Sequence, residues 1–332
     1  MRYIVDVPSH LAERIRKLIE SGEYVDLQEF VRVAIENQLH LQELPQGPVT
    51  EGEAADQPLH NQHLSSLLTN LPLNLLAIPA RELPTLLNPQ KPSSITIWGL
   101  YNRVFPAKVA IRVMYNLAAL RASPSIDLKE VQSEASRSAR QLGTELSYLD
   151  AKARKLHGEK MATGLPLGSR DRSTLRYEEM FVGTLGKDDT PQGLPAELGF
   201  AALIREKGKA VIGLTELGAR FAKFQNPILD MEHDHQDSIF SNEEAGFLIS
   251  NIKDRLPEEW SRCVAVLRAI EHGKNTPKAI ETALISSKRD SDAAPTERAG
   301  ILSRLTETGL IKRRRDGLNV SYSITEKGSE WT

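Results

Sequence analysis

The chain has 332 residues, 40% of them apolar, a formal net charge of −2 and one cysteine, Cys263. This length allows two or three domains with separate cores. A single cysteine excludes an internal disulfide framework and a cluster of thiolate metal ligands, which favours a reducing, cytoplasmic location. No apolar run approaches the ~20 residues of a membrane-spanning helix, so we expect no membrane partner.

The N-terminal segment RYIVDVP, residues 2–8, alternates as a β-strand and stops at a proline. Two helices are predicted after it: Ser9 can cap the first, and Asp26 with Glu29 forms a capping-box pattern for the second. One strand and two short helices are too small to fold alone, and the strand would keep both edges unpaired. We therefore expect residues 1–42 to form a homodimer in which two copies of the strand pair antiparallel.

The stretches RYIVDVPSHLAERIRKLIESGEY and VDLQEFVRVAIENQL resemble the ribbon–helix–helix superfamily of DNA-binding proteins, which includes the Arc, CopG and ParD types. In that family the paired strands enter the major groove, and alternate side chains contact base edges. The resemblance implies that Arg2, Ile4 and Asp6 read bases and that amides near Leu27 and Gln28 meet a phosphate. The alternative is a dimerisation module with little affinity for DNA, because the segment is net acidic.

Residues 43–93 are predicted to be a linker followed by a Pro/Leu-rich arm. Residues 43–63 lack periodicity and are rich in proline, glycine and acid, which is typical of a linker. Residues 64–93 are rich in leucine, but repeated prolines prevent a long helix. We expect this arm to pack as short turns against the next domain.

The middle domain is predicted over residues 94–230. A buried helix is expected from Ala107 to Leu120, and an apolar stripe runs from Leu128 to Leu156 with Gly143 as the break between two helices. The segment KAVIGLTELGARFA predicts a strand and then a helix capped at Thr215. This order resembles a winged helix. The alternative keeps residues 128–156 as one long helix that pairs with its copy in a dimer.

The C-terminal domain, residues 241–332, follows an acidic linker at residues 231–240. A capping box at Ser241 and Glu244 predicts its first helix, to about Arg255. Three more helices are predicted, at Pro257 to His272, at Pro277 to Ile285 and from Pro295 to Gly309. Two strands joined at Asp316 and Gly317 follow. The stretch LTETGLIKRRRDGLNVSYSITEKG resembles the recognition helix and wing of winged-helix transcription factors of the MarR/PadR kind.

Cations gather in this last segment, where residues 298–327 hold seven Lys and Arg against three acids. A basic stretch beside a recognition helix favours contact with duplex DNA. Alternation along the strand KRRR sends two cations to each face, so one pair must face outward. The predicted DNA contacts are Thr296, Arg298, Ser303 and Arg304 on the helix and Lys312, Arg313, Arg314 and Arg315 on the strand. A second candidate DNA surface consists of Arg137, Arg140, Lys152, Arg154 and Lys155. The alternative for that set is the ordinary polar face of amphipathic helices.

We expect no enzymatic activity and no cofactor. The chain has no nucleophile elbow, P-loop, Rossmann fingerprint or zincin helix. The His233 and His235 pair, like His60 and His63, has no nearby residues that complete four zinc ligands. Cys263 lies among aliphatic residues, which is typical of a core position.

The sequence therefore predicts a mainly α protein with small β ribbons: an N-terminal ribbon–helix–helix and two winged-helix-type domains. We expect a homodimeric, sequence-specific binder of double-stranded DNA that acts as a transcriptional repressor on a palindromic operator. Two alternatives stay open. One is a plasmid replication, partition or defence-associated DNA-binding protein, and the other is an antitoxin-like module that grips a protein partner.

Overall fold

The computed structural model describes residues 87–92, 96–97, 99–155, 158–167, 171–230, 239–284, 294–316 and 319–332, together with Arg16, Ile19 and Leu27. Arg2, Ile4, Asp6 and Gln28 lie outside these residues, so the paired ribbon and its DNA contacts stay predictions. Leu27 lies in helix and is 55% exposed. The described chain is mainly helical with small antiparallel sheets, as predicted. Over the same ranges, no helix combines the length and apolarity needed to cross a bilayer.

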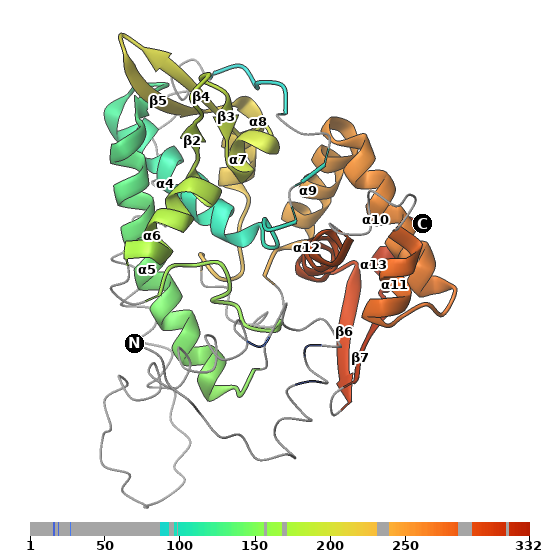
Figure 1. The fold of residues 1–332 in the computed structure, drawn as a ribbon. Coiled ribbons are helices and arrows are strands. Elements are labelled where there is room, and N and C mark those ends of the chain that lie inside the picture. The colour runs from blue at the N-terminus through green and yellow to red at the C-terminus, as the bar shows by residue number, and fades with distance from the viewer. Residues whose placement is uncertain are drawn as a thin grey trace, which may run out of the picture.

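The N-terminal lobe, residues 99–230, joins helices to one three-stranded sheet (Figure 1). The sheet is antiparallel, with the strand order β1-β5-β4, while β2 and β3 form a separate ribbon. Its elements are α4 (Phe105–Arg121), β1 (Ile126–Asp127), α5 (Leu128–Lys152), α6 (Asp171–Tyr177), the π-helix η1 (Glu178–Val182), β2 (Thr184–Leu185), β3 (Pro191–Gln192), α7 (Leu194–Glu197), β4 (Ala201–Glu206), β5 (Lys209–Leu214) and α8 (Glu216–Lys223).

The predicted break at Gly143 is wrong, because α5 is one uninterrupted helix. A side chain at Gly143 would place its Cβ 2.9 Å from the carbonyl oxygen of Pro166. The missing side chain at Gly143 therefore lets the segment around Pro166 pack closely against α5, and the glycine does not end the helix. The alternative of a single helix agrees with the structure here, although its apolar face packs on α4 of the same chain. The predicted cap of α8 is confirmed, since the Thr215 hydroxyl accepts a hydrogen bond from the Gly218 amide at 3.1 Å.

The C-terminal lobe, residues 239–332, follows its predicted order. The Ser241 side chain and the Glu244 side chain cap α9 reciprocally, so the predicted capping box is confirmed. A two-stranded hairpin follows α12, also as predicted, and the lobe ends in the short helix α13, which was not predicted from the sequence. Its elements are α9 (Asn242–Arg255), α10 (Pro257–Glu271), α11 (Pro277–Leu284), α12 (Ala294–Glu307), β6 (Ile311–Asp316), β7 (Asn319–Ile324) and α13 (Glu326–Ser329).

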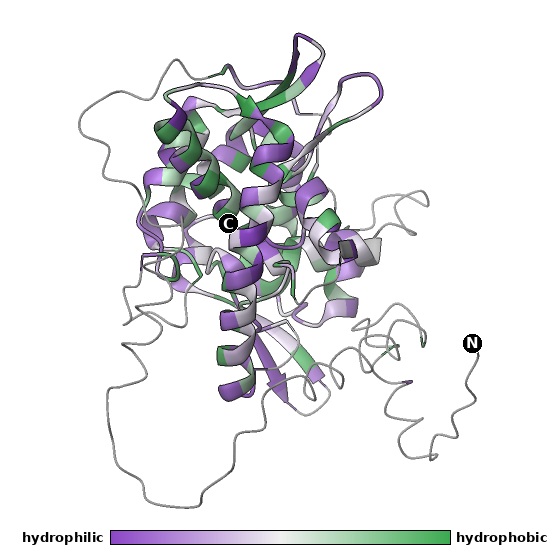
Figure 2. Ribbon diagram, turned by 90° about the vertical axis from the view of Figure 1, so that its left-hand side faces the viewer, coloured by the Kyte–Doolittle hydropathy of each residue, from purple (hydrophilic) through white to green (hydrophobic). Residues whose placement is uncertain are grey.

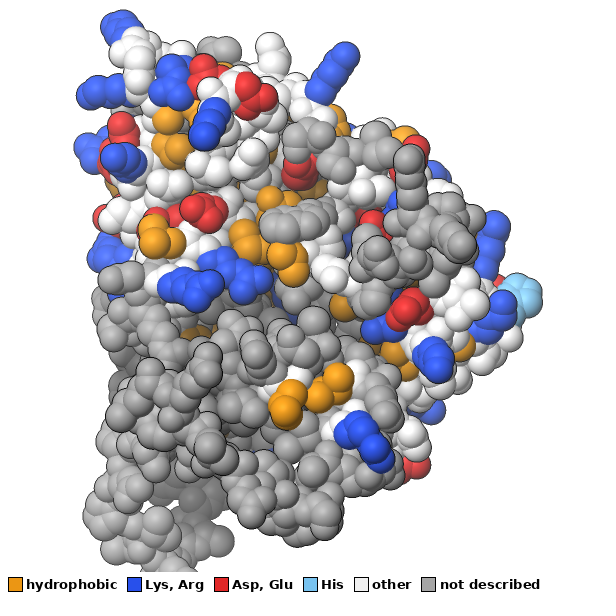
Figure 3. All heavy atoms as spheres, in the orientation of Figure 1, with side chains coloured by type: hydrophobic (Ala, Val, Ile, Leu, Met, Phe, Trp, Pro, Cys, Tyr) orange, Lys and Arg blue, Asp and Glu red, His pale blue; other side chains and the backbone are white. Residues whose placement is uncertain are grey.

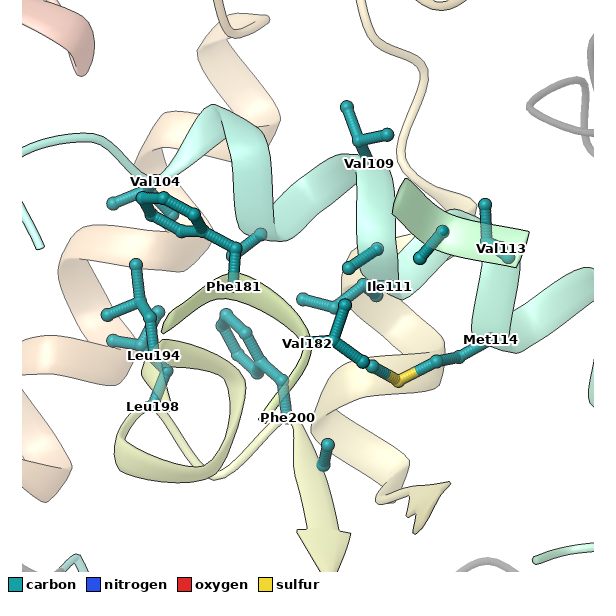
Figure 4. Close-up of a cluster of buried hydrophobic side chains, with 14 of the residues drawn as sticks. Val104, Val109, Ile111, Val113, Met114, Phe181, Val182, Leu194, Leu198 and Phe200 are labelled. Carbon is teal, nitrogen blue, oxygen red and sulfur yellow. The ribbon is translucent and has the colours of Figure 1, made fainter. Parts of the chain in front are cut away.

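Two apolar cores meet on α9. Leu248 and Ile252 belong to the core of the N-terminal lobe, whereas Ile249 belongs to that of the C-terminal lobe. Figure 4 shows the first core around α4, where Val104 and Ile111 lie near side chains from η1 and α7, with Phe200, the residue before β4, beside them. In Figure 2, the long helix α5 alternates hydrophilic and hydrophobic residues, as expected of a helix with one buried face. Because α9 contributes to both cores, the lobes are packed together rather than linked loosely.

Buried ion pairs reinforce this packing. Lys108 on α4 lies 2.7 Å from a Glu244 carboxylate oxygen on α9, and both side chains are fully buried. Arg112, one turn along α4, makes two bonds to the Asp230 carboxylate, at 2.7 and 2.6 Å. Both cations also donate to the Phe224 carbonyl just after α8. Such charges are tolerated inside a protein only when paired, so α4, α8 and α9 are fixed to one another.

The described end of the predicted arm, residues 87–92, lies against the sheet of the N-terminal lobe. The side-chain amide of Gln90 donates to the Leu203 carbonyl at 2.9 Å and accepts from the Leu203 backbone amide at 3.1 Å. This one side chain therefore satisfies the edge of β4 at Leu203 in the way that a neighbouring strand would. The Gln90 carbonyl in turn accepts from Arg255 at the end of α9.

Candidate nucleic-acid interface

The β6–β7 hairpin separates its four cations onto two faces. Ile311, Arg313 and Arg315 lie on the side that packs inward, while Lys312 and Arg314 are exposed. The pairing register places small hydroxyl residues, Ser321 and Ser323, opposite the two exposed cations. The expectation that one pair faces outward is confirmed. This outer face offers two cations and two hydroxyls, the donors that bind phosphate oxygens.

Arg313 holds the hairpin against the N-terminal lobe. Its guanidinium lies 3.3 Å from the Glu159 carboxylate, and its side chain is only 10% exposed. It also covers Gly158, where an added Cβ would lie 3.4 Å from the Arg313 Cζ atom. Buried Arg103 donates to the Gly158 carbonyl at 2.9 Å, so the segment around this glycine is held from both sides. Arg313 is therefore placed as a clamp between the lobes rather than as a DNA contact.

This clamp brings two sequence-predicted sets of cations to one end of the molecule. The C-terminal end of α5 and the β6–β7 hairpin both project toward the lower end in Figures 1 and 2. We call this region the basic end. It holds eight cations against two acids, Glu159 and Asp316. Its cations are Lys152, Arg154, Lys155, Lys160, Lys312, Arg313, Arg314 and Arg315.

Two helix residues predicted to contact DNA are buried instead. Arg304 is 3% exposed, and its guanidinium binds the Glu259 carboxylate and the Tyr101 carbonyl, the latter at 2.8 Å. Arg298 is 6% exposed and forms an ion pair with Glu281 on α11. The prediction that these arginines contact DNA is therefore wrong in this structure, because their charges already have buried or partly buried partners. Both belong to the framework that holds α12.

The face of α12 toward the N-terminal lobe is also covered. The Glu307 carboxylate accepts hydrogen bonds from the amides of Val104, at 2.6 Å, and Phe105, at 3.0 Å, and so caps the start of α4. Burial raises the pKa of Glu307, an effect that nearby Arg103 opposes. The remaining predicted helix contacts differ: Thr296 is exposed, and Ser303 is half-buried. The outward stripe of Thr296, Ala299, Ser303 and Thr306 on α12 is small and uncharged, and Glu297 beside it pairs with Arg262.

The second candidate DNA surface is divided by the structure. Arg137 is exposed and pairs with Glu134, and Arg140 donates to Thr174 on α6, so these two lie at the middle of α5. Lys152 is 15 residues beyond Arg137, about 22 Å along the helix at 1.5 Å per residue. Arg154 and Lys155 follow it directly at the basic end. Only the last three of the five predicted residues therefore belong to the same surface as the hairpin.

Sequence reasoning missed a second hairpin, β4–β5, at the upper end of the molecule in Figures 1 and 2. Its tip exposes Lys207 and Lys209, with Gly208 between them. The signal was present, because AALIRE and KAVIGL are two strand-like runs separated by Lys-Gly. Figure 3 shows Lys and Arg side chains around this upper end and along the left side, where α5 lies.

The cavity beside Cys263 between the lobes has a volume of about 20 Å³, enough for one water molecule. Burial raises the pKa of the Cys263 thiol, which disfavours the reactive thiolate. Within the described ranges, no group of three His, Cys, Asp or Glu side chains is arranged to hold a metal ion. His60, His63, His233 and His235 lie outside those ranges.

Comparisons with protein-family models, with curated proteins and with solved structures gave no match.

Proposed function

We propose that the chain binds double-stranded DNA through the basic end and acts as a homodimeric transcriptional regulator in the cytoplasm. The observation that carries this proposal is the convergence of seven cations against one acid, Asp316, on the hairpin and the adjoining end of α5, once the clamp pair of Arg313 and Glu159 is set aside. A duplex carries one phosphate charge per ~1.7 Å of axis, so a compact group of cations gains affinity by releasing condensed counterions.

The connectivity of the two lobes supports two winged-helix units. In the N-terminal lobe, α4, β1, α5, α6, β4 and β5 follow the order helix–strand–helix–helix–strand–strand with the sheet order β1-β5-β4, and η1, β2, β3 and α7 are inserted between α6 and β4. In the C-terminal lobe, α10, α11 and α12 precede the β6–β7 hairpin. The Asn275 carbonyl, between α10 and α11, accepts from the Tyr322 amide on β7 at 2.9 Å. In a winged helix, a first strand between the first two helices pairs with the hairpin. Here this single hydrogen bond to β7 takes the place of that strand pairing.

The salt dependence of duplex affinity tests the proposal. Exchanging Lys312 and Arg314 for alanine should reduce the slope of log affinity against log salt by about 2, since each phosphate contact contributes about 0.9. Alanine at Lys129 and Lys223, two exposed lysines of the N-terminal lobe, removes the same charge and should leave the slope unchanged. An unchanged slope in the hairpin variant, or no duplex binding by the unaltered chain at low salt, would contradict the proposal.

A further inference from the structure

In the proposed winged-helix unit of the C-terminal lobe, α12 is the candidate recognition helix, because it directly precedes the β6–β7 hairpin. Its Leu302 and Leu305 side chains belong to the core of that lobe. With about 3.6 residues per turn, the side of α12 that faces away from this core carries Thr296, Gly300, Ser303 and Glu307. A recognition helix in the major groove presents this outer side to the bases. Of these four residues, however, two are buried, one is half-buried and only Thr296 is exposed.

The segment that leads into α4 covers the outer side of α12. Gly99 and Gly300 meet there, and a Cβ added at Gly300 would lie 2.7 Å from the Gly99 carbonyl oxygen. A Cβ added at Gly99 would lie 2.6 Å from the carbonyl oxygen of Thr296, one turn earlier on α12. The two glycines therefore let the two backbones pack directly against each other. Figure 1 shows α12 at this junction between the two lobes.

Polar contacts extend this cover along the rest of the helix. The Tyr101 carbonyl accepts a hydrogen bond from Arg304 at 2.8 Å. The backbone amides of Val104 and Phe105 donate to the Glu307 carboxylate at 2.6 and 3.0 Å. The cover therefore extends from the first turn of α12 to its last residue.

A helix covered in this way is too thick for the major groove. The groove of B-form DNA is about 12 Å wide, and an α-helix with its side chains is about 10–12 Å across. The groove therefore accepts one helix and has no room for a second backbone on the side that would meet the bases. Uncovering α12 would separate the lobes and leave the buried charges of Lys108 and Glu244 without partners.

The parts of the lobe that stay accessible suit phosphates better than bases. The uncovered stripe of α12 ends in methyl and hydroxyl groups, whereas bases are distinguished mainly by bidentate side chains such as Arg, Asn and Gln. On the hairpin, Lys312 and Arg314 are exposed at alternate positions, about 6.7 Å apart along the strand. This spacing is about two phosphate steps of 3.4 Å along one DNA strand. Contacts to phosphates position a protein on the duplex but carry no sequence information.

We infer that the C-terminal lobe holds duplex DNA by its phosphate backbone without reading the base sequence, and that α12 is a structural helix of the seam between the lobes. This inference rests on the proposed function and names the ligand class of this lobe, a B-form duplex of any sequence. Lys312 and Arg314 are the phosphate contacts, and α12 stays outside the groove. Any sequence preference of the whole chain then comes from residues outside this lobe.

Fluorescence anisotropy with the full-length chain and a panel of labelled duplexes tests the inference. The duplexes have equal length and unrelated base sequences, from A·T-rich to G·C-rich. The hairpin variant Lys312→Ala/Arg314→Ala should lose about tenfold in affinity at low salt, by the same factor within about twofold on every duplex. The α12 variant Thr296→Ala/Ser303→Ala/Thr306→Ala should stay within about twofold of the unaltered chain on every duplex, since a base-reading contact would contribute about fivefold or more.

A bulky substitution on α12 is the second probe. Ala299 is exposed on the uncovered stripe, so the fold can accept Ala299→Tyr. The tyrosine ring would collide with the DNA if α12 entered the major groove. The affinity of this variant should therefore stay within about twofold of that of the unaltered chain on every duplex.

Two results would overturn the inference while the proposed function stands. One is a loss of affinity that differs about fivefold or more between duplexes, in either the hairpin variant or the α12 variant. The other is a loss of about tenfold or more by folded Ala299→Tyr on any duplex. If the unaltered chain binds no duplex at low salt, the proposed function itself fails. Circular dichroism reports whether each variant is folded, and the α12 variant decides alone if Ala299→Tyr is not.

Discussion

Replacing Lys108 with methionine should lower the free energy of unfolding by about 3–5 kcal/mol, the range for breaking a buried ion pair. Methionine has nearly the same length and fills the same space, so the loss of packing is small. The loss comes from Glu244, which is fully buried and would no longer have the ammonium group 2.7 Å away. The Phe221 and Phe224 carbonyls, which accept hydrogen bonds from Lys108, would also lose their donor.

The same lysine gives the stability a defined pH dependence. Burial, together with nearby Arg112, lowers the pKa of Lys108 from 10.5 to about 8, although Glu244 opposes the shift. Between pH 8 and 10.5 the folded chain therefore binds fewer protons than the unfolded chain at this site. Stability from this group should rise with pH across that window, by at most about 3 kcal/mol. The Lys108→Met variant should lack this rise.

Urea denaturation followed by tryptophan fluorescence measures both effects. Lys129→Met is the matched control, because Lys129 is exposed at the start of α5 and should change stability by less than about 0.5 kcal/mol. The double variant Lys108→Met/Glu244→Gln removes the buried charge and should recover part of the loss. Two results would show that the Lys108–Glu244 pair is not buried as described. One is a loss of less than about 1 kcal/mol in the free energy of unfolding of Lys108→Met, and the other is the same rise of that free energy with pH as in the unaltered chain.

Four further predictions concern backbone contacts and the seam between the lobes. Gly218→Ala should destabilise the protein by about 2 kcal/mol or more in urea denaturation, because the new Cβ would lie 1.9 Å from the Phe200 carbonyl oxygen. Gly246→Ala, in a helix with no atom within 4 Å, should instead stabilise by about 0.5–1 kcal/mol. Arg313→Ala should lower the melting temperature while reducing the salt slope of duplex binding by less than about 1, since its side chain is a clamp. Glu307→Ala should cost about 2–5 kcal/mol in urea denaturation, because two buried amides lose their acceptor.

The parts of the fold that the sequence predicted depend on short-range contacts. The capping box of Ser241 and Glu244 is complete within four residues, and Thr215 caps α8 within the same span. Proline at the start of α10 and the alternation along β6 and β7 are equally local. These features were recognisable because the residues that satisfy each other are neighbours in the sequence.

Gly143 shows why other features were not predicted. A glycine inside a helical pattern can mark a break or a close approach, and only the position of the other segment decides between them. Here the other segment is Pro166, more than twenty residues further on. The π-helix η1 and the short ribbon β2–β3 depend in the same way on packing against segments that are distant in the sequence.

The candidate site carries the same lesson, because arginines in one basic stretch have different roles. Arg304 and Arg314 are ten residues apart, yet Arg304 ends in a buried pair with Glu259, whereas Arg314 is exposed. The sequence shows which positions are polar, but it does not show which polar face a second lobe covers. The partner acid on α10 and the carbonyl of Tyr101 decide the matter, and both are far from Arg304 in sequence. Charge counts along the chain therefore overestimate the surface available to DNA. The count becomes informative only after the arginines that join the lobes are subtracted, which leaves Lys312 and Arg314 as the hairpin residues most directly exposed to a phosphate backbone.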